Sequence, residues 1–322
     1  RLILGAPPGA GKTTRVPLAL AGLFGDGSPI PGKILMLEPR RIAARMAAQR
    51  MAATVGERLG QRVGLSTRVD RKVSQETVIE VITDGLFTRR LLADPELTGI
   101  GAVIFDEIHE RGLNADLRLT LAYEVQTALR DDLHLLAMSA TLDTAALAQK
   151  FDAPVIESEW RQYPVETRYL GRTQDRLEDQ MARAITRALR ETDGSILAFL
   201  PGAGEIRRTA ERLTLDEKTL VAPLYGALSP QEQDAAIRPS ADGRRKVVLA
   251  TDIAESALTI EGVSVVVDSG FARVPVYVPG CLSTELRTVR ATRANGDQRR
   301  GAHPAGGRQS GPRSRQDEAA KA

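Results

Sequence analysis

The sequence predicts an α/β protein with two tandem domains, each a mostly parallel sheet with helices on both faces. Short runs that are apolar throughout alternate with longer stretches of helical period, as expected for strands buried on both sides of a parallel sheet. The runs form two series, and the periodicity lapses between them over residues 157–164, where Pro164 restarts an extended segment. A chain of 322 residues is long enough for two domains of ordinary size.

The predicted elements follow these two series in order. In the first series we expect helices at 40–55 and 113–130, and strands at 1–4, 33–38, 62–67, 77–82, 102–105 and 134–138. In the second we expect helices at 176–192, 205–213 and 230–237, and strands at 165–170, 195–200, 220–224, 246–250 and 263–268. The predicted domains are 1–160 and 161–300, and the composition of residues 301–322 predicts a disordered basic tail.

One helix start is unusually clear from local chemistry. In "LSPQE", Ser229 is an N-cap residue, Pro230 suits the first helical position, and Glu232 stands where it closes a capping box. Trp160, in the stretch between the two series, is expected to be a packing anchor rather than a ligand contact.

Composition and charge restrict the class of protein. The single cysteine, Cys281, excludes an intrachain disulfide framework and favours a reducing, cytoplasmic compartment. No apolar run approaches eighteen residues, so no membrane span is predicted. Residues 286–322 carry a net charge of +6 and the whole chain +3, so residues 1–285 are mildly acidic. Bulk charge therefore does not indicate nucleic-acid binding, and only locally placed arginines can do so.

The run "LILGAPPGAGKTT" predicts a phosphate-binding loop between a strand and a helix. It is a relaxed P-loop, because Ala6 stands at the first position, where glycine is usual. Backbone N–H groups of such a loop surround phosphate oxygens, its lysine reaches the β- and γ-phosphates, and its hydroxyl ligates Mg²⁺. The alternative is a glycine-rich turn with a chance lysine, which the strand–loop–helix context disfavours. The predicted nucleotide contacts are Gly9, Ala10, Gly11, Lys12, Thr13 and Thr14.

The run "AVIFDEIHERG" places paired carboxylates at the end of an apolar strand. Asp106 fits an anchor for the Mg²⁺ shell, and Glu107 can orient and deprotonate the attacking water. We therefore assign Thr13, Asp106 and Glu107 to the metal, and Lys12, Glu107 and His109 to catalysis. Alone, the acidic pair would more simply be a surface pair. A zinc site at His109 is disfavoured, because three histidines and one cysteine offer no zinc-ligand spacing.

With "DEIHE", the sequence resembles the DEAH-box helicases of superfamily 2. Seven blocks resemble the motifs I, Ia, Ib, II, III, IV and V of that family in order: "GAPPGAGKTT", "LEPRRIAARMAAQRMA", "TDGLFTRRL", "DEIHER", "MSATLD", "FLPGAGEI" and "ATDIAESALTIEGVSVVVDSGFAR". Ile108 replaces the family's alanine in "DEIHER". The residues of "FLPGAGEI", motif IV, and "DEIHER", motif II, are most similar to the bacterial HrpB-type branch. The resemblance covers residues 1 to about 301.

The resemblance implies two RecA-like P-loop domains that hold ATP, or other NTPs, with Mg²⁺ between them. It further implies hydrolysis of the NTP coupled to 3′-to-5′ movement along single-stranded RNA or DNA. We also expect a monomer without a metal cluster. By position, Arg50 and Phe271 would stack on the base, with Asp268 beside them, and Ser139 and Thr141 would couple phosphate state to domain closure. The residues that would contact the nucleic-acid backbone are Arg40, Arg41, Thr83 and Thr251.

Each of these positions also has a plainer interpretation. Arg40, Arg41 and Arg50 can be the solvated face of a helix, Ser139 and Thr141 a turn after a strand, and Phe271 part of a core. Residues 273–292 read as a hairpin with a turn near Pro279, which is either the strand-separating wedge of the family or an ordinary edge hairpin.

The sequence departs from the family at motif VI, which runs Q-R-x-G-R-x-G-R. Gln298, Arg299 and Gly301 match, and we assign Gln298 to catalysis, but Ala302 and Ala305 stand where the next two arginines belong. Because such arginines contribute roughly 10³–10⁵ in rate, we expect ATP binding with impaired hydrolysis. A shifted reading frame near residue 301 is our hypothesis for the departure. A non-hydrolysing nucleotide- and RNA-binding fragment is the alternative function, and a different P-loop ATPase is disfavoured by the second series of strands.

Overall fold

The computed structural model describes residues 1–7, 9–110, 112–140, 144–158, 165–171, 174–255, 260–278, 280 and 283–301, with the backbone of 308–311. The chain divides into two compact units, Arg1–Arg161 and Gln162–Ala322. Thr141, Trp160, Cys281, Ala302 and Ala305 lie outside the described residues.

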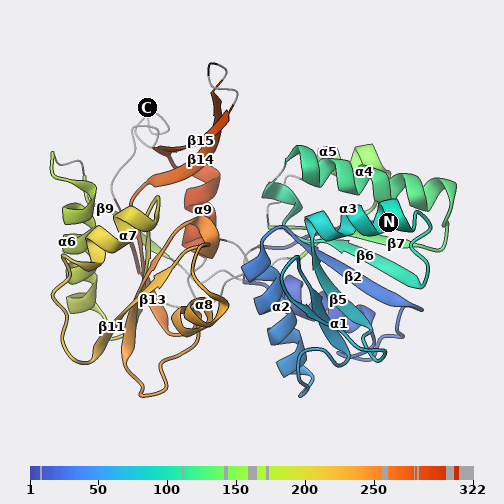
Figure 1. Cartoon of the computed structure of the whole chain (residues 1–322), viewed down its shortest axis with the longest axis horizontal. Helices are drawn as coiled ribbons and strands as arrows, with labels where there is room; N and C mark the ends of the chain where they lie inside the picture. The colour runs from blue at the N-terminus through green and yellow to red at the C-terminus, as the bar shows by residue number, and fades with distance from the viewer. Residues whose placement is uncertain are drawn as a thin grey trace. The chain divides into compact units, whose positions relative to one another are not determined.

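The first unit is an eight-stranded sheet with helices on both faces (Figure 1). Its strand order is β4-β3-β5-β2-β6-β7-β1-β8, and all the pairings are parallel except that of β3 with β4. The strands are β1 (Leu2–Gly5), β2 (Lys33–Glu38), β3 (Val63–Ser66), β4 (Arg71–Lys72), β5 (Ile79–Thr83), β6 (Ile100–Phe105), β7 (His134–Ser139) and β8 (Val155–Glu157). The helices are α1 (Lys12–Leu20), α2 (Arg41–Thr54), α3 (Asp84–Ala93), α4 (Leu113–Ala128), α5 (Ala145–Phe151) and the short 3₁₀ helix η1 (Ile108–Glu110).

Burial on both faces explains why the strands of this unit are apolar throughout. Along β2, Ile34 and Met36 pack in one core cluster with residues of α1 and α2, whereas Leu35 and Leu37 pack in another with residues of α3, α4 and α5. Successive side chains of a strand point to opposite faces, so each residue of β2 meets a helix layer.

The second unit is a six-stranded parallel sheet with an attached hairpin (Figure 1). Its strand order is β11-β12-β10-β13-β16-β9, and a core cluster packs Met181 and Ile185 of α6 with Val247 and Val265 of the sheet. The strands are β9 (Glu166–Tyr169), β10 (Ser195–Phe199), β11 (Thr219–Leu224), β12 (Arg245–Ala250), β13 (Val263–Asp268) and β16 (Arg308–Gly311). The hairpin strands are β14 (Phe271–Val278) and β15 (Ser283–Arg290), and the helices are α6 (Leu177–Glu191), α7 (Ala203–Ala210), α8 (Pro230–Ile237), α9 (Arg293–Gly301) and the 3₁₀ helix η2 (Asp252–Ala254).

The predicted fold class is confirmed, and one segment of the predicted tail forms a strand. Residues 308–311 were expected within a disordered tail, but their backbone forms β16, which pairs with β13 on one side and β9 on the other. A sheet edge offers unpaired N–H and C=O groups that any extended segment can pair with, so composition carries no signal for this strand. The other residues of the predicted tail lie outside the described part of the chain.

The capping box at the start of α8 is confirmed and makes a prediction about stability. The Ser229 hydroxyl accepts from the backbone N–H of Glu232 at 3.3 Å, and Glu232 accepts from the backbone N–H of Ser229 at 2.8 Å. Ser229→Ala is therefore expected to lower the free energy of unfolding of the second unit by about 1 kcal/mol, as measured by urea denaturation. Ser28→Ala, at an exposed loop serine, is the matched control. Equal urea midpoints for the two variants would contradict the role of the cap.

Candidate active site

The phosphate-binding loop leaves the end of β1 and enters the first turn of α1. Gly9 and Gly11 have φ angles of +82° and +81°, in the left-handed region that favours glycine. A β-carbon at Gly9 would meet no atom within 4 Å, so backbone conformation rather than crowding requires this glycine. Lys12 is the first residue of α1, and the free N–H groups of a helix N-terminus attract anions. The loop therefore has a backbone conformation compatible with a P-loop, and its binding of phosphate stays a prediction.

Parallel strand order brings the paired carboxylates to the same edge of the sheet as this loop. Strands β6, β7 and β1 are adjacent, and their carboxyl ends carry Asp106, Ser139 and the loop, respectively. The Ala6 N–H donates to the Ser139 carbonyl at 3.0 Å, which ties the start of the loop to the end of β7. The C-terminal edge of a parallel sheet is where ligands bind in α/β folds.

Asp106 is buried, and its two carboxylate oxygens differ in their hydrogen bonding. Its Oδ1 accepts from the backbone N–H of Glu107 at 2.9 Å, whereas its Oδ2 is buried and has no donor among the described residues unless the neighbouring carboxyl of Glu38 is protonated. A buried carboxylate oxygen without a partner is costly in a protein interior, unless a ligand completes it. The oxygen chemistry and the position beside the loop fit Mg²⁺, which takes one or two carboxylates together with phosphate oxygens.

Glu107 is a strained and buried carboxyl beside the loop lysine. Its φ of +52° lies in the left-handed region, which is strained for a residue other than glycine. Such backbone strain costs about 1–3 kcal/mol and is found most often at functional sites. Its Oε1 lies 3.9 Å from Nζ of Lys12. Burial first, and then repulsion by Asp106, raise the pKa of Glu107 to about 8, against the opposing effect of Lys12. A pKa near neutrality suits a general base.

His109 connects the carboxylates to the end of β7. Its Nδ1 accepts from the backbone N–H of Ala140 at 3.2 Å and lies 3.3 Å from Oε2 of Glu107. Burial, with repulsion from Lys12, lowers the pKa of His109 to about 4, so the imidazole is neutral at pH 7. It acts as an acceptor and orienting group here, and the hydrogen bond from Ala140 places its proton on Nε2.

Glu38 is a buried carboxyl of this site that the sequence reasoning missed. It ends β2, is 0% exposed, and neither of its oxygens has a hydrogen-bond donor among the described residues. Burial raises the pKa of Glu38 well above its usual value, and the charges of Asp106 and Glu107 raise it further. The sequence did contain a signal for Glu38, because it is an acidic residue at the end of an apolar strand, and the same pattern predicted the role of Asp106.

The residues predicted to bind nucleic acid or the base lie on both units, and their roles stay predictions. Arg40 forms an ion pair with Glu110 at 3.2 Å, and Arg41, the first residue of α2, is exposed. Arg50 is exposed near the end of α2, and Thr83 precedes α3. In the second unit, Thr251 follows β12. Asp268 ends β13, Phe271 begins β14 and Gln298 lies on α9, and all three residues are half-buried.

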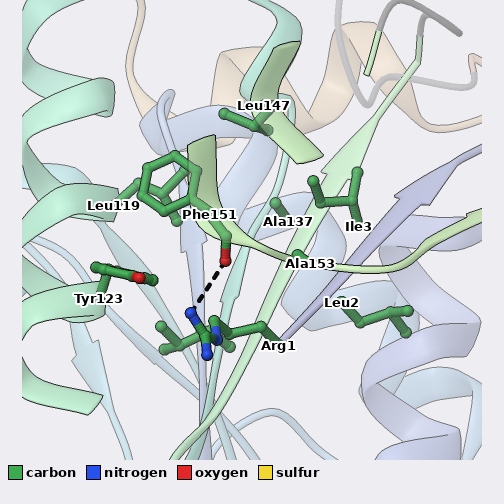
Figure 2. A pocket seen from close by; sticks show the side chains of 10 residues that line it. Arg1, Leu2, Ile3, Leu119, Tyr123, Ala137, Leu147, Phe151 and Ala153 are labelled. Carbon is green, nitrogen blue, oxygen red and sulfur yellow. Dashed lines mark hydrogen bonds between the residues drawn. The ribbon is translucent and has the colours of Figure 1, made fainter. Parts of the chain in front are cut away.

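A pocket elsewhere in the first unit contains none of the predicted site residues (Figure 2). It lies against β1, α4 and α5, and its lining is almost wholly apolar. Arg1 closes one side, donating to the carbonyl of Phe151 at 3.1 Å with its guanidinium 5.0 Å from the ring centre of Tyr123. With few polar groups to orient a substrate, this pocket is a packing gap in the core rather than a site.

Within the described residues, no three or more His, Cys, Asp or Glu side chains are grouped so that they could hold a metal ion. None of the described helices is both long and apolar enough to cross a membrane.

Fold and site together define a class, the P-loop NTPases built from two tandem RecA-like domains. Two family models define the class of protein more closely. The model described as "DEAD/DEAH box helicase" matches residues 1–149, and the model described as "Helicase conserved C-terminal domain" matches residues 178–295. Residues 1–149 thus belong to the DEAD/DEAH box helicase domain family, and residues 178–295 to the helicase C-terminal domain family.

Individual relatives confirm the resemblance to the HrpB-type branch. The chain is 49% identical over 305 residues to the "ATP-dependent RNA helicase HrpB" of Escherichia coli (strain K12), covering 94% of this chain and 37% of the relative. It is 36% identical over 307 residues to the "ATP-dependent RNA helicase HrpA homolog" of Haemophilus influenzae, covering 93% of this chain and 23% of the relative. The crystal structure of the E. coli DEAH/RHA helicase HrpB matches with a TM-score of 0.89 at 46% identity, over 100% of this chain and 41% of that one. The chain thus spans well under half the length of these relatives.

Proposed function

We propose that this chain is the NTP-hydrolysing core of an ATP-dependent RNA helicase, which couples hydrolysis to movement along a single strand. The observation that carries the proposal is the placement of Lys12, Asp106 and Glu107 at one sheet edge, with Lys12 and Glu107 3.9 Å apart. The family, and the names of relatives that cover more than nine-tenths of this chain, support the helicase reading.

In the proposed reaction, water attacks the γ-phosphorus of ATP, and the bond from that phosphorus to the β–γ bridging oxygen breaks. Glu107 takes the proton of the attacking water, ADP leaves with the bridging oxygen, and phosphate is formed. Lys12 and the loop N–H groups orient the phosphates and stabilise their charge. The neutral His109 accepts from Ala140 and thereby holds the segment after β7 against the catalytic glutamate.

We propose that Thr13 and Asp106 hold the Mg²⁺ that accompanies the nucleotide. The free buried Oδ2 of Asp106 supports this assignment. When bound, the ion would neutralise charge on the phosphate oxygens. We further propose a cytoplasmic protein, which the single cysteine supports, and a monomer.

The nucleic-acid partner is tested by ATP hydrolysis with and without single-stranded RNA. We expect single-stranded RNA to raise turnover, and single-stranded DNA of the same sequence identifies whether the 2′-hydroxyl matters. Arg41→Gln should weaken RNA binding and lower the magnitude of its salt slope by about 1, because one phosphate contact is lost. Arg58→Gln, at another exposed arginine of this unit, is the control. Turnover that is unaffected by any nucleic acid would favour a different P-loop ATPase.

A second candidate function is a non-hydrolysing nucleotide- and RNA-binding module. Ala302 and Ala305, where the family has arginines, favour it. ATP affinity without measurable turnover, in the presence of RNA, would identify this module.

A further inference from the structure

Arg299 of α9 is among the most deeply buried side chains of the second unit. It is 1% exposed, and each of its three guanidinium nitrogens has a partner inside the protein. Nε and Nη2 each lie 2.7 Å from Oε1 of Glu255, and Nη1 donates to Oδ1 of Asp268 at 2.6 Å. The guanidinium carbon also lies 5.0 Å from the ring centre of Phe199, at the end of β10. A side chain bound on all sides in this way does not extend outward to a phosphate.

The partners of Arg299 define the turn between β13 and β14. Oδ1 of Asp268, which ends β13, also accepts from the backbone N–H of Gly270 at 2.9 Å. Nη1 of Arg299 donates a second bond, at 3.2 Å, to the carbonyl of Phe271, which begins β14. One guanidinium nitrogen therefore fixes both ends of residues 268–271.

Glu255 gives Arg299 a second, independent anchor. Its other oxygen, Oε2, accepts from Nδ2 of Asn295, one turn before Arg299 on α9. Both carboxylates that face Arg299 are thus held by additional donors, so the guanidinium has little freedom to shift. Buried, fork-shaped pairing of this kind specifies geometry as well as energy.

We propose that Arg299 is a positioning residue that holds residues 268–271 so that the half-buried ring of Phe271 is presented to the nucleobase. It touches no nucleotide itself. The inference rests on the proposed function in that it requires the chain to bind ATP, and on the predicted stacking of Phe271 on the base. Motif VI of this chain therefore combines two roles. Arg299, the motif arginine that remains, supports the fold of the second unit, whereas positions 302 and 305, which lack arginine, are those expected at the phosphate.

The test compares affinity for ATP with affinity for inorganic triphosphate, which has no base, in the full chain. Arg299→Lys keeps the charge but cannot span both carboxylates and the Phe271 carbonyl. We expect it to weaken ATP binding about tenfold, as lost stacking would, and to leave triphosphate binding unchanged. Arg300→Lys is the matched control, because Arg300 is the next residue, is exposed, and only approaches Asp297 at 3.8 Å. It should change neither affinity.

Phe271→Ala and the double variant separate this inference from the proposed function. If Phe271→Ala leaves ATP binding unchanged, the stacking role fails and the positioning role fails with it. If Phe271→Ala weakens ATP binding but Arg299→Lys does not, the positioning role alone is wrong. If Arg299 acts through Phe271, the double variant should bind ATP as Phe271→Ala does, and additive losses would overturn the proposal.

The experiment must also establish whether the Arg299→Lys variant remains folded. Circular dichroism shows whether Arg299→Lys keeps its second unit folded. Should that unit unfold, Arg299 supports the whole domain rather than this turn, and the proposal is rejected. Asp268→Asn then provides an independent check, because it weakens the contact of Arg299 with the turn and leaves the pairing of Arg299 with Glu255. Unchanged ATP affinity in Asp268→Asn would also reject the proposed positioning role of Arg299.

Discussion

Changing Ala302 and Ala305 to arginine together is expected to raise ATP turnover by about 10³- to 10⁵-fold. These are the two positions at which the DEAH-box motif VI has arginines and this chain has alanines, and both lie outside the described residues. Guanidinium groups stabilise the negative charge that the γ-phosphate oxygens carry in the transition state, and nothing else in the motif supplies that charge. Phosphate release at saturating ATP measures the change.

The control for this double variant adds the same charge elsewhere in the same segment. Ala319→Arg with Ala320→Arg raises the net charge equally but lies outside the motif, so it should leave turnover unchanged. Equal turnover in both double variants would show that the loss of these arginines is not what limits hydrolysis in this chain. The binding-module alternative would then gain support only if ATP affinity were intact.

Replacing Glu107 by glutamine is expected to lower turnover by about 10²- to 10⁴-fold, because a positioned general base contributes that much. ATP affinity should change little, since the phosphate loop and Asp106 remain. The experiment is best performed in the background with the two arginines restored, where the rate is high enough for a loss to be measured. Glu110→Gln is the matched control: the same change three residues on, at a glutamate paired with Arg40 at 3.2 Å.

The pH dependence gives a second readout of the same prediction. The pKa of Glu107 is raised to about 8, chiefly by burial, so below that pH the protonated form dominates and cannot accept a proton from water. Turnover should therefore rise with pH and level off above about 8, whereas the residual rate of Glu107→Gln should lack this rise. A flat profile in the parent chain would argue against Glu107 as the base.

Features that depend only on neighbouring residues could be predicted from the sequence. The apolar strands, the capping box at Ser229, the glycine-rich loop with Lys12 and the pair Asp106-Glu107 are each contained in a few consecutive residues. The alternation of strands and helices predicted the parallel sheets, and parallel sheets place strand ends together, which is why the loop and the carboxylates could be expected at one edge.

Which distant groups meet, and how burial changes their pKa values, depends on the three-dimensional packing of the chain. Glu38 joins Asp106 because β2 and β6 are neighbours in the sheet, and Arg299 joins Glu255 and Asp268 because α9 packs beside β13. The tail residues 308–311 add a strand because a sheet edge was open to them, whatever their side chains. The physical reason is common to all three: strand pairing, desolvation and buried ion pairs depend on long-range packing, which no local pattern encodes.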